Sequence, residues 1–345
     1  MAADRDWRST LVDHWQRPHS SLLSRALQPL SWLYGAAAAI DRALYDTGLR
    51  RAEHAPRPVI VVGNLVAGGA GKTPTVIALV ALLRNLGYRP GVISRGHGRS
   101  TSDPQRVTAD SSATTVGDEP LLIHLRTRAP VAVARRRIDA ARLLCSGAEP
   151  IDLLVADDGL QHHALVRDVQ VLVFDERGGG NGLLLPAGPL RQHLPAALPA
   201  KSIVVYNASR PSTVLPGFLA RRRLLGAVSL EGWWQGQAAD PARLQALQGR
   251  RLIACAGMAQ PQRFFAMLEQ AGLSVERLAM PDHEPYRQLP WPEHAEDVIV
   301  TEKDAVKMSP ERTGRTRVWV APLDFTLDAE FGPALRRLLP PPPTP

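Results

Sequence analysis

Residues 59–74 contain the feature that most constrains this chain: an apolar strand, a glycine-rich loop and a helix start, in that order. The segment reads Val-Ile-Val-Val-Gly-Asn-Leu-Val-Ala-Gly-Gly-Ala-Gly-Lys-Thr-Pro. Such a loop presents backbone N–H groups to an anion at a helix N-terminus, where the helix dipole also favours phosphate. The order therefore predicts a P-loop, with Lys72 on the β- and γ-phosphates of a nucleotide and the Thr73 hydroxyl on Mg²⁺.

The residues predicted to bind the nucleotide phosphates are consecutive. They are Val66, Ala67, Gly68, Gly69, Ala70, Gly71, Lys72 and Thr73. One position departs from the usual motif, because Val66 stands five residues before Gly71, where a glycine is expected. An ordinary flexible turn is the simpler alternative, and the combination of strand, glycines and helix argues against it.

The composition indicates a folded chain with an excess of positive charge. Its 345 residues are enough for two domains, and a hydrophobic fraction of 45% allows proper cores. The net charge of +8 favours anionic partners without choosing among phosphates, lipid headgroups and nucleic acid. Two isolated cysteines fit a reducing compartment and exclude a disulfide framework. We expect no signal peptide, and no run reaches the roughly 18 apolar residues of a transmembrane helix.

A segment near the N-terminus, residues 20–51, has two possible interpretations. Apolar residues recur at helical spacing, with Trp and Tyr beside them and arginines around them. An apolar face, interfacial aromatics and flanking arginines are typical of a helix that lies in a membrane surface. The alternative is a helix packed on the domain core, and the pattern by itself slightly favours that alternative.

Strands and helices alternate from residue 58 onward. The predicted strands are short, β-branched and continuously apolar, as strands buried on both faces are: 58–62, 90–94, 130–134, 151–156, 169–174 and 202–206. A second set follows a polar stretch at 208–223, with strands at 251–255, 274–279, 297–301 and 317–320 and a helix at 261–271. Alternation of this kind predicts a mostly parallel sheet with helices on both faces.

Polar clusters follow several of the predicted strands, where parallel sheets place their sites. The clusters are 94–99, 116–120, 157–163, 178–191, 281–286 and 301–304. Asp157 and Asp158 resemble a Walker B position, at which a carboxylate meets Mg²⁺. A helix N-cap at these two residues and a solvent-exposed Arg191 are the structural alternatives. A His/Asp metal site at 157–163 is a further alternative, for which the spacing supplies no third ligand.

In combination, these motifs resemble the tetraacyldisaccharide 4′-kinase family, the lipid A 4′-kinases of Gram-negative bacteria. The resemblance extends over nearly the whole chain. It is carried by Leu30-Ser-Trp-Leu-Tyr34, Val62-Gly-Asn-Leu65, Gly68-Gly-Ala-Gly-Lys-Thr-Pro74, Ser94-Arg-Gly96, Gly117-Asp-Glu-Pro120, Asp157-Asp-Gly159, Leu185-Pro-Ala-Gly-Pro-Leu-Arg191, Ala256-Gly-Met-Ala-Gln-Pro261, Pro281-Asp-His283 and Thr301-Glu-Lys-Asp304. It also accounts for Val66, because the loop of this family typically lacks the first glycine.

The resemblance and the alternation together imply an α/β fold: a P-loop NTPase-like, mostly parallel sheet with helices on both faces, plus a smaller second α/β domain. We predict five regions along the sequence. They are an amphipathic, membrane-associating segment at 1–51, a P-loop kinase domain at 52–207, a linker at 208–225, a C-terminal α/β domain at 226–337 and a disordered proline-rich tail at 338–345.

The activity that the resemblance implies is transfer of the ATP γ-phosphoryl group to the 4′-hydroxyl of tetraacyldisaccharide 1-phosphate, giving lipid IV-A. The cofactors are then ATP and Mg²⁺. Lys72 holds the phosphates and Asp118 takes the hydroxyl proton, with His283 as its partner. The candidate Mg²⁺ ligands are Thr73, Glu119, Asp157 and Asp158. The candidate substrate residues are Arg191, Gln192 and Asn181.

The same resemblance favours membrane contact for the N-terminal segment. It places the protein at the cytoplasmic face of the inner membrane as a peripheral protein. We predict no nucleic-acid partner and no obligate protein partner. The chain departs from the family pattern at His97, Leu160 and Gln192, where Tyr, Phe and Glu are common. The last of these leaves position 192 with a hydrogen-bonding role at most.

The rival hypothesis is a regulatory P-loop NTPase, a GTPase switch or a metallochaperone, whose output is binding. Such a protein reads guanine through an N/T-K-x-D element. The run Thr301-Glu-Lys-Asp304 is similar, but Lys303 and Asp304 are adjacent, without the intervening residue. The spacing therefore argues against a guanine site there.

Overall fold

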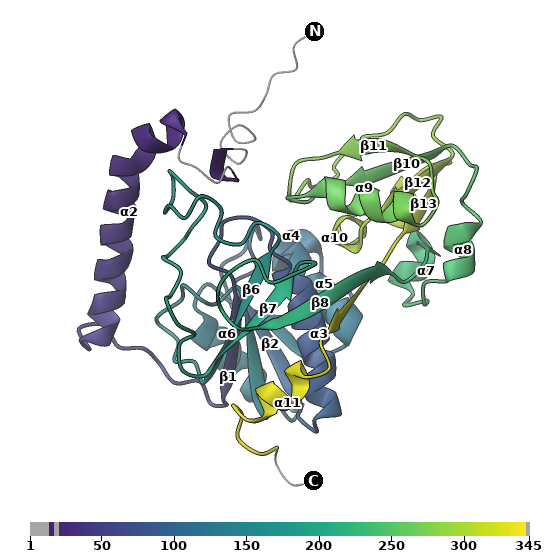
Figure 1. Ribbon diagram of the computed structural model, residues 1–345. Coiled ribbons are helices and arrows are strands. Elements are labelled where there is room, and N and C mark those ends of the chain that lie inside the picture. Colours follow the sequence, from purple (N-terminus) through teal and green to yellow (C-terminus); the bar gives the residue numbers. More distant parts are fainter. Residues whose placement is uncertain (1–13, 17–20, 343–345) are drawn as a thin grey trace. The chain divides into compact units, whose positions relative to one another are not determined.

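The computed structural model describes residues 14–16 and 21–342 (Figure 1). Parts of two predicted regions fall outside these ranges: residues 1–13 and 17–20 of the N-terminal segment, and residues 343–345 of the proline-rich tail. The described chain forms two compact units. Unit 1 comprises residues up to 92, 145–220 and 327 onward, and unit 2 comprises residues 93–144 and 221–326.

Unit 1 contains the P-loop and the central strands of a large sheet. Its elements are α2 (Leu22–Asp46), β1 (Val59–Gly63), α3 (Lys72–Asn85), β5 (Leu153–Asp157), β6 (Val169–Asp175), β7 (Ser202–Asn207) and α11 (Phe331–Arg336). Three strands contain residues of both units: β2 (Pro90–Ser94), β8 (Phe218–Leu224) and β14 (Leu323–Leu327). The sheet has the strand order β14-β8-β7-β6-β1-β5-β2-β4-β3, in which β4 (Val131–Val133) and β3 (Gln105–Val107) belong to unit 2.

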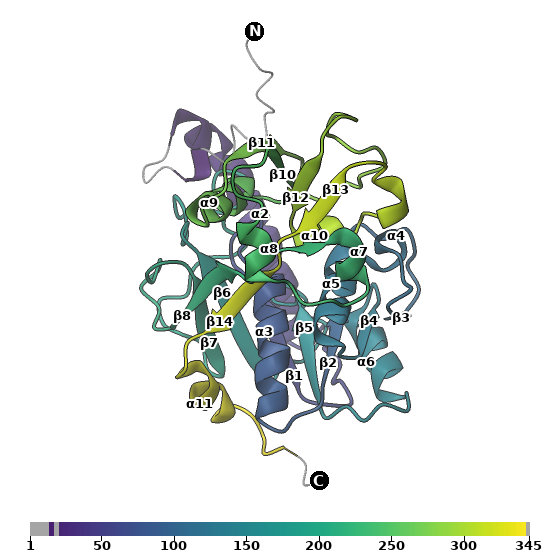
Figure 2. The ribbon, with the colours of Figure 1, turned by 90° about the vertical axis from the view of Figure 1, so that its right-hand side faces the viewer.

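The central strands of this sheet are parallel and buried. β1 pairs with β5 on one side and with β6 on the other, so that Val62 lies beside both Asp157 and Val171. Every residue of β1, β5 and β7 is buried, which explains why these strands read as continuous apolar runs. α3 packs on this sheet through Val76, Leu79, Val80 and Leu83, at the spacing of one helix face (Figure 2).

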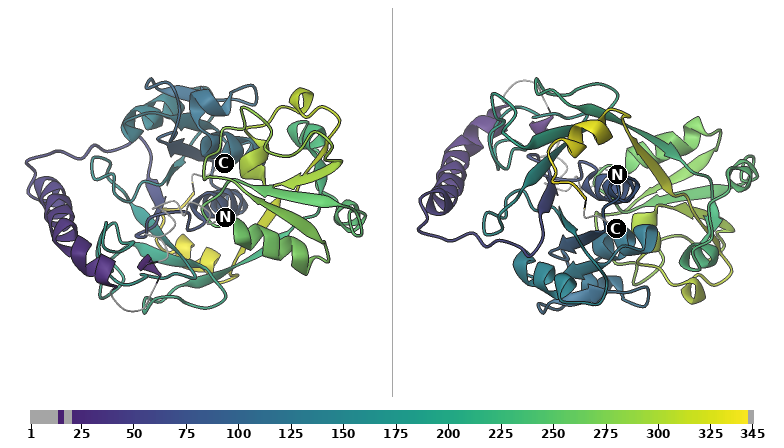
Figure 3. Two further views of the ribbon diagram at one scale, coloured as in Figure 1. Left: turned by 90° about the horizontal axis from the view of Figure 1, so that it is seen from above. Right: turned by 90° about the horizontal axis from the view of Figure 1, so that it is seen from below.

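Unit 2 contains a second, smaller sheet. Its strand order is β11-β10-β12-β13-β9, parallel except for β9. The strands are β9 (Val228–Ser229), β10 (Leu252–Ala256), β11 (Val275–Ala279), β12 (Asp297–Val300) and β13 (Arg317–Val320). α9 (Pro261–Gln270) packs against β10 and β11, with Phe265 and Leu268 fully buried (Figure 3, green).

The remaining elements of unit 2 are short. They are β3 (Gln105–Val107), α4 (Ala113–Val116), α5 (Asp118–Thr127), β4 (Val131–Val133), α6 (Arg137–Cys145, whose last residue belongs to unit 1), α7 (Leu230–Trp234), α8 (Pro241–Gln245), α10 (Glu302–Ala305) and the 3₁₀ turn η1 (Pro310–Arg312).

The predicted α/β fold with a large, mostly parallel sheet is confirmed, and each predicted strand is present within a few residues. Sequence reasoning missed β3, β8, β9 and β14. β8 lies inside the predicted linker 208–225 and reads Phe-Leu-Ala-Arg-Arg-Arg-Leu, with one face exposed. Its arginines hide the apolar pattern, because a strand near a sheet edge does not need burial on both faces. The two units also differ from the predicted order of domains, since residues 93–144 belong with 221–326.

Helix α2 buries polar side chains and exposes apolar ones. Its buried residues are Ser24 and Ser31, whereas Trp32 and Leu33 are 67% and 68% exposed. The views in Figures 1 and 3 show one long side of α2 (purple) with no neighbouring element of unit 1. The core-packing interpretation of this helix therefore fails for its apolar stripe. Within the described residues, no helix combines the length and the apolarity needed to cross a bilayer.

Candidate functional site

The P-loop connects the end of β1 to the start of α3. Gly71 caps α3 with a φ of 95°, and a methyl group there would lie 2.1 Å from Asn207 Nδ2. Only glycine fits such a left-handed and crowded position. Gly68 also has a positive φ, 91°. The loop thus bends into a cradle of backbone N–H groups at a helix N-terminus, which is the form that binds phosphate.

The structure explains the valine that replaces the usual first glycine of the motif. Val66 is buried and forms an antiparallel bridge with Leu190, and the Ala67 N–H donates to the Pro189 carbonyl at 2.7 Å. The first half of the loop is therefore held as an extended pair with residues 189–191. An extended residue with a buried side chain suits valine and gains nothing from glycine.

Three polar side chains donate hydrogen bonds to backbone carbonyls of the P-loop. None of the three was assigned a role from the sequence. Asn64 donates to the Gly68 carbonyl at 3.2 Å and accepts from Lys72 Nζ at 3.2 Å. Arg177 donates to the Ala67 and Gly69 carbonyls, both at 3.3 Å. Asn207 donates to the Ala70 carbonyl at 2.9 Å. With these carbonyls held by side chains, the N–H groups of the loop after Ala67 face a ligand, whereas the Ala67 N–H is bonded to the Pro189 carbonyl.

The two aspartates of the Walker B-like position lie at the end of β5. Asp157 is the last residue of the strand and is buried. Asp158 has a φ of 47°, lies 3.6 Å from Lys72 Nζ and accepts from Arg191 Nη1 at 3.2 Å. Unit 1 therefore brings together the predicted phosphate lysine, one candidate metal ligand and the predicted substrate arginine.

The residues present in unit 1 fit a magnesium ion of the kind that phosphates help to hold. Mg²⁺ prefers oxygen ligands and is commonly bound by one or two carboxylates together with substrate phosphates. Thr73, Asp157 and Asp158 supply such oxygens beside the P-loop. Among the described residues, no three His, Cys, Asp or Glu side chains gather as a complete metal cage. The His/Asp metal site considered at 157–163 is therefore not supported.

The loop that carries the other predicted substrate residues is tied to α2. The Asn181 carboxamide forms hydrogen bonds within this loop: it donates to the Ala187 carbonyl at 3.0 Å and accepts from the Leu183 N–H at 3.1 Å. The Ser31 hydroxyl donates to the Leu184 carbonyl at 2.8 Å, and the Tyr34 hydroxyl donates to the Arg191 carbonyl at 3.0 Å. Asn181 thus shapes the loop. Gln192, next to Arg191, is half-buried.

In unit 2, the predicted base and its partner are in contact. Asp118 begins α5 after Gly117, and His283 Nδ1 lies 2.8 Å from Asp118 Oδ2. Because an ionised carboxylate only accepts, the imidazole Nδ1–H is the donor. Burial alone would raise the pKa of Asp118, but the His283 hydrogen bond and the charge of Lys303 hold it below its usual value. The bond to Asp118 raises the pKa of His283, and burial and Lys303 oppose that rise.

Lys303 organises the acidic side chains around this pair. Its Nζ lies 2.9 Å from Asp282 Oδ1, 3.4 Å from Glu119 Oε1 and 3.4 Å from His283 Nε2. Burial would lower the pKa of this ammonium, and the carboxylates of Glu119 and Asp282 raise it above its ordinary value. The Glu119 carboxylate, a predicted metal ligand, is therefore engaged by a cation of unit 2.

The loop that presents His283 is fixed by a buried aspartate. Asp304 accepts from the Tyr286 hydroxyl at 2.9 Å and from the Thr301 hydroxyl at 2.7 Å. Both oxygens of Asp304 also accept from the Gly257 N–H at 3.1 Å. His283 and Tyr286 have positive φ values of 62° and 49°. Backbone strain of this kind persists where the surroundings hold it, so Asp304 helps to set the position of the imidazole.

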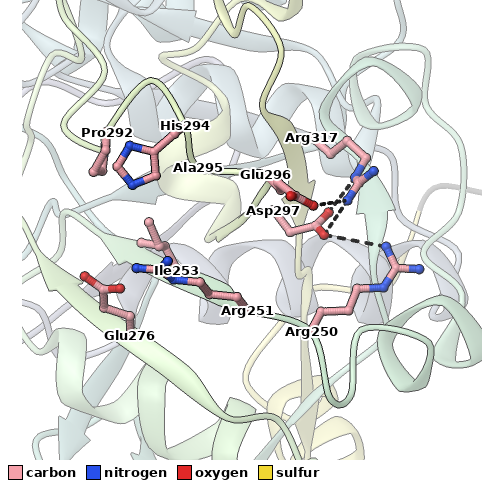
Figure 4. A pocket seen from close by; sticks show the side chains of 10 residues that line it. All are labelled: Arg250, Arg251, Ile253, Glu276, Pro292, His294, Ala295, Glu296, Asp297 and Arg317. Carbon is pink, nitrogen blue, oxygen red and sulfur yellow. Dashed lines mark hydrogen bonds and ion pairs between the residues drawn. The ribbon is translucent and has the colours of Figure 1, made fainter.

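A cavity of about 380 Å³ lies elsewhere in unit 2, at the amino ends of β10, β12 and β13 (Figure 4). Arg317 and Arg250 point to the Asp297 carboxylate, which accepts from Arg317 at 2.7 and 2.8 Å. Parallel sheets bind ligands at the carboxyl ends of their strands, so we assign this network a structural role. The hydrogen bonds from Arg317 lower the pKa of Asp297, against the opposing effect of burial.

This network predicts a pH-dependent contribution to stability. Asp297→Asn is expected to lower the free energy of unfolding by about 1–3 kcal/mol at neutral pH, because a charged hydrogen-bonded pair is lost. The pKa of Asp297 is depressed in the folded state. Its contribution is therefore present above the unfolded pKa and is lost as the pH falls through the folded value. Urea unfolding of both proteins at pH 7 and pH 3 should show the gap closing at low pH. A constant gap would contradict the assignment.

Known proteins with similar sequences belong to the family that the motifs resemble. A family model described as tetraacyldisaccharide-1-P 4′-kinase matches residues 23–340. The chain belongs to this family. It is 56% identical to the tetraacyldisaccharide 4′-kinase of Methylibium petroleiphilum, over 96% of this chain and 93% of that protein. It is 52% identical to the enzyme of the same name from Leptothrix cholodnii, over 94% of each chain.

A solved structure agrees with the family assignment. The crystal structure of LpxK from Aquifex aeolicus in complex with ATP has a TM-score of 0.74 and 27% identity, covering 92% of this chain and 99% of that chain. The resemblance stated from the motifs is thus confirmed, and the chain is a kinase of this family. The rival interpretation as a regulatory P-loop NTPase is not favoured.

Some residues of the candidate site left a signal in the sequence and others left none. Asn64 lies within the motif Val62-Gly-Asn-Leu65, directly after β1, and Arg177 directly precedes the polar cluster 178–191, so the sequence marked both positions. Lys303 is one of only four lysines in the chain. Asn207 directly follows the strand predicted at 202–206, without any motif around it, and is the last residue of β7. Its contact with the P-loop exists only in the folded chain.

Proposed function

We propose that this kinase transfers the γ-phosphoryl group of ATP to the 4′-hydroxyl of tetraacyldisaccharide 1-phosphate, with lipid IV-A as the product. Membership of the family supports the substrate and the reaction. The observation that carries the proposal is the braced P-loop with Lys72, together with the Asp118–His283 pair. Phosphoryl transfer requires positioning and charge neutralisation more than covalent chemistry, and these residue types supply both.

Unit 1 supplies the nucleotide end of the reaction in this proposal. Residues 68–73 hold the phosphates through backbone N–H groups, since the Ala67 N–H is already bonded to the Pro189 carbonyl. Lys72 neutralises charge on the β- and γ-phosphates. Thr73, Asp157 and Asp158 are the residues that would hold Mg²⁺, which neutralises phosphate charge when it is bound. Glu119 remains a candidate that would have to leave Lys303 to bind a metal.

Unit 2 supplies the general base in this proposal. The Asp118 carboxylate accepts the proton of the 4′-hydroxyl, and His283 orients it and stabilises its charge through the 2.8 Å hydrogen bond. A positioned base typically contributes about 10²–10⁴-fold. Lys303 keeps the neighbouring carboxylates in place, and Asp304 keeps the His283 loop in place.

Arg191 is the side chain that we propose for substrate recognition, with Gln192 beside it. A guanidinium suits an anionic or polar headgroup because it offers several donors in one plane. In this structure Arg191 bonds to Asp158 at 3.2 Å and to Gln161 at 3.4 Å. Asn181, the third substrate residue expected from the sequence, shapes the loop that leads to Arg191.

We further propose that α2 rests on the cytoplasmic surface of the inner membrane, as a peripheral attachment. Its exposed apolar side chains are Leu22, Leu23, Leu30, Trp32, Leu33 and Ile40. Monomeric proteins rarely expose such a contiguous apolar stripe without a binding role. An acylated substrate resides in a membrane, so a kinase that acts on it needs access to that surface.

The structure changes which residues should matter most for membrane binding. Arg42 lies 3.5 Å from Asp46, and Arg50 lies 2.6 Å from Asp41, so these arginines are partly neutralised. We expect Trp32→Ser with Leu33→Ser to weaken binding to anionic liposomes by roughly tenfold or more, since each buried apolar side chain contributes about 1.5–3 kcal/mol. Arg42→Ala should have a smaller, salt-dependent effect. Co-sedimentation at low and high salt measures both.

A matched control for this prediction lies elsewhere in unit 1. Val214 is also apolar and exposed but does not belong to α2. Val214→Ser should leave liposome binding unchanged. Equal binding by the α2 double variant and the wild type would show that α2 does not contact the membrane.

The proposed reaction has a direct test. Purified protein, γ-labelled ATP and purified tetraacyldisaccharide 1-phosphate should yield a labelled lipid, separated by thin-layer chromatography. A regulatory NTPase would release labelled inorganic phosphate and leave the lipid unlabelled. That outcome would overturn the proposal.

A further inference from the structure

Asn207 lies at the carboxyl end of β7 and is in contact with the P-loop. Its side-chain amide donates to the Ala70 carbonyl at 2.9 Å. The backbone of Gly71 passes so close that any side chain there would collide with Asn207 Nδ2. Because Nδ2 faces a carbonyl, the orientation of the carboxamide is fixed, and Oδ1 is the atom left over.

Within the described part of the chain, the Asn207 Oδ1 atom is a buried hydrogen-bond acceptor without a donor, which is unusual in a folded protein. Asn207 is 3% exposed, and its Oδ1 is buried without a hydrogen-bond partner among the described residues. A buried acceptor without a donor destabilises a fold, and native proteins keep few of them. The chain leaves the sheet directly after Asn207, and Ser209 and Arg210 are exposed. The orphaned oxygen therefore lies at the carboxyl end of β7, where parallel sheets place their ligands, next to Ala70 and Gly71 of the P-loop.

The chemistry of the nucleotide limits what could satisfy this oxygen. The triphosphate of ATP offers acceptors only. The donors of ATP are the two ribose hydroxyls and the 6-amino group of adenine. Asn64 provides a contrast, because its carboxamide oxygen also lies under the loop but already accepts from Lys72 at 3.2 Å.

We propose that Asn207 is a specificity-determining residue for the nucleotide, and that its Oδ1 accepts a hydrogen bond from the 6-amino group of adenine. The inference rests on the proposed use of ATP. Guanine and hypoxanthine carry a carbonyl oxygen at the same position, which would face Oδ1 as a second acceptor. A site built to accept from a donor rejects an analogue that lacks the donor, because its own polar group is then left unpaired.

The test compares nucleotides and variants by equilibrium binding, so that it does not depend on phosphoryl transfer. Isothermal titration of the full chain with Mg²⁺ and ATP, purine riboside triphosphate or 2′-deoxy-ATP gives three dissociation constants. We expect wild type to bind ATP roughly tenfold more tightly than purine riboside triphosphate, which lacks only the 6-amino group. In Asn207→Ala that ratio should fall to about one. Asn64→Ala is the matched control and should weaken both ligands equally.

The outcomes separate the inference from the proposed function. Equal losses for ATP and purine riboside triphosphate in Asn207→Ala would show that Asn207 only holds Ala70, and would overturn the inference. A wild-type preference against 2′-deoxy-ATP that disappears in Asn207→Ala would assign the oxygen to ribose and overturn it as well. If Asn207→Ala does not fold, equal wild-type affinities for ATP and the purine analogue decide against it. Wild type that binds no nucleotide would remove the use of ATP itself.

Discussion

Lys72→Ala is expected to abolish phosphoryl transfer while the chain stays folded. The ammonium of Lys72 is held in place by Asn64 at 3.2 Å and lies 3.6 Å from Asp158, at the first residue of α3. In the proposed mechanism it neutralises charge that grows between the β- and γ-phosphates. Removing a preorganised group of this kind typically costs about 10²–10³-fold in kcat, and we expect a loss at or above the upper end.

The measurement needs controls that separate charge from packing. Lys72→Met keeps the aliphatic stem and should lose as much activity as Lys72→Ala. Lys201→Gln removes an exposed lysine outside the site and should retain wild-type turnover. Circular dichroism and thermal unfolding establish that each variant folds. Near-normal kcat in folded Lys72→Met would remove the P-loop lysine from the mechanism.

The second large effect is expected at the Asp118–His283 pair. Asp118→Ala and His283→Ala should each lower kcat by about 10²–10⁴-fold. Because the two side chains share one 2.8 Å hydrogen bond, the double variant should lose little more than the worse single variant. Rates are measured with ATP and tetraacyldisaccharide 1-phosphate at saturation.

Controls for this cycle come from the same unit. His294 is an exposed histidine at the amino ends of the smaller sheet, and His294→Ala should leave kcat unchanged. Asp118→Asn keeps the shape of the side chain but removes its ability to take a proton, so it should resemble Asp118→Ala. Single losses that multiply in the double variant would show that the two residues act independently.

The fold class was largely available from the sequence. The strands that are buried on both faces, β1 and β5 to β7, read as continuous apolar runs, and periodicity detects those directly. β8 escaped detection because three consecutive arginines, Arg221 to Arg223, interrupt its apolar residues on a half-exposed strand. Burial on one face weakens the local signal, and only the neighbouring strands show that such a segment pairs.

The sequence by itself determined the P-loop, the Walker B-like aspartates and the family, because these depend on residues that are adjacent in the chain. Only the tertiary structure showed which distant residues contact these motifs. His283 meets Asp118 across 165 residues, and Asn207 meets Ala70 across 137. Val66 became understandable only through its bridge to Leu190. A local motif follows from the order of residues, whereas these contacts depend on which strand ends the sheet brings together, and strand order is a property of the folded chain.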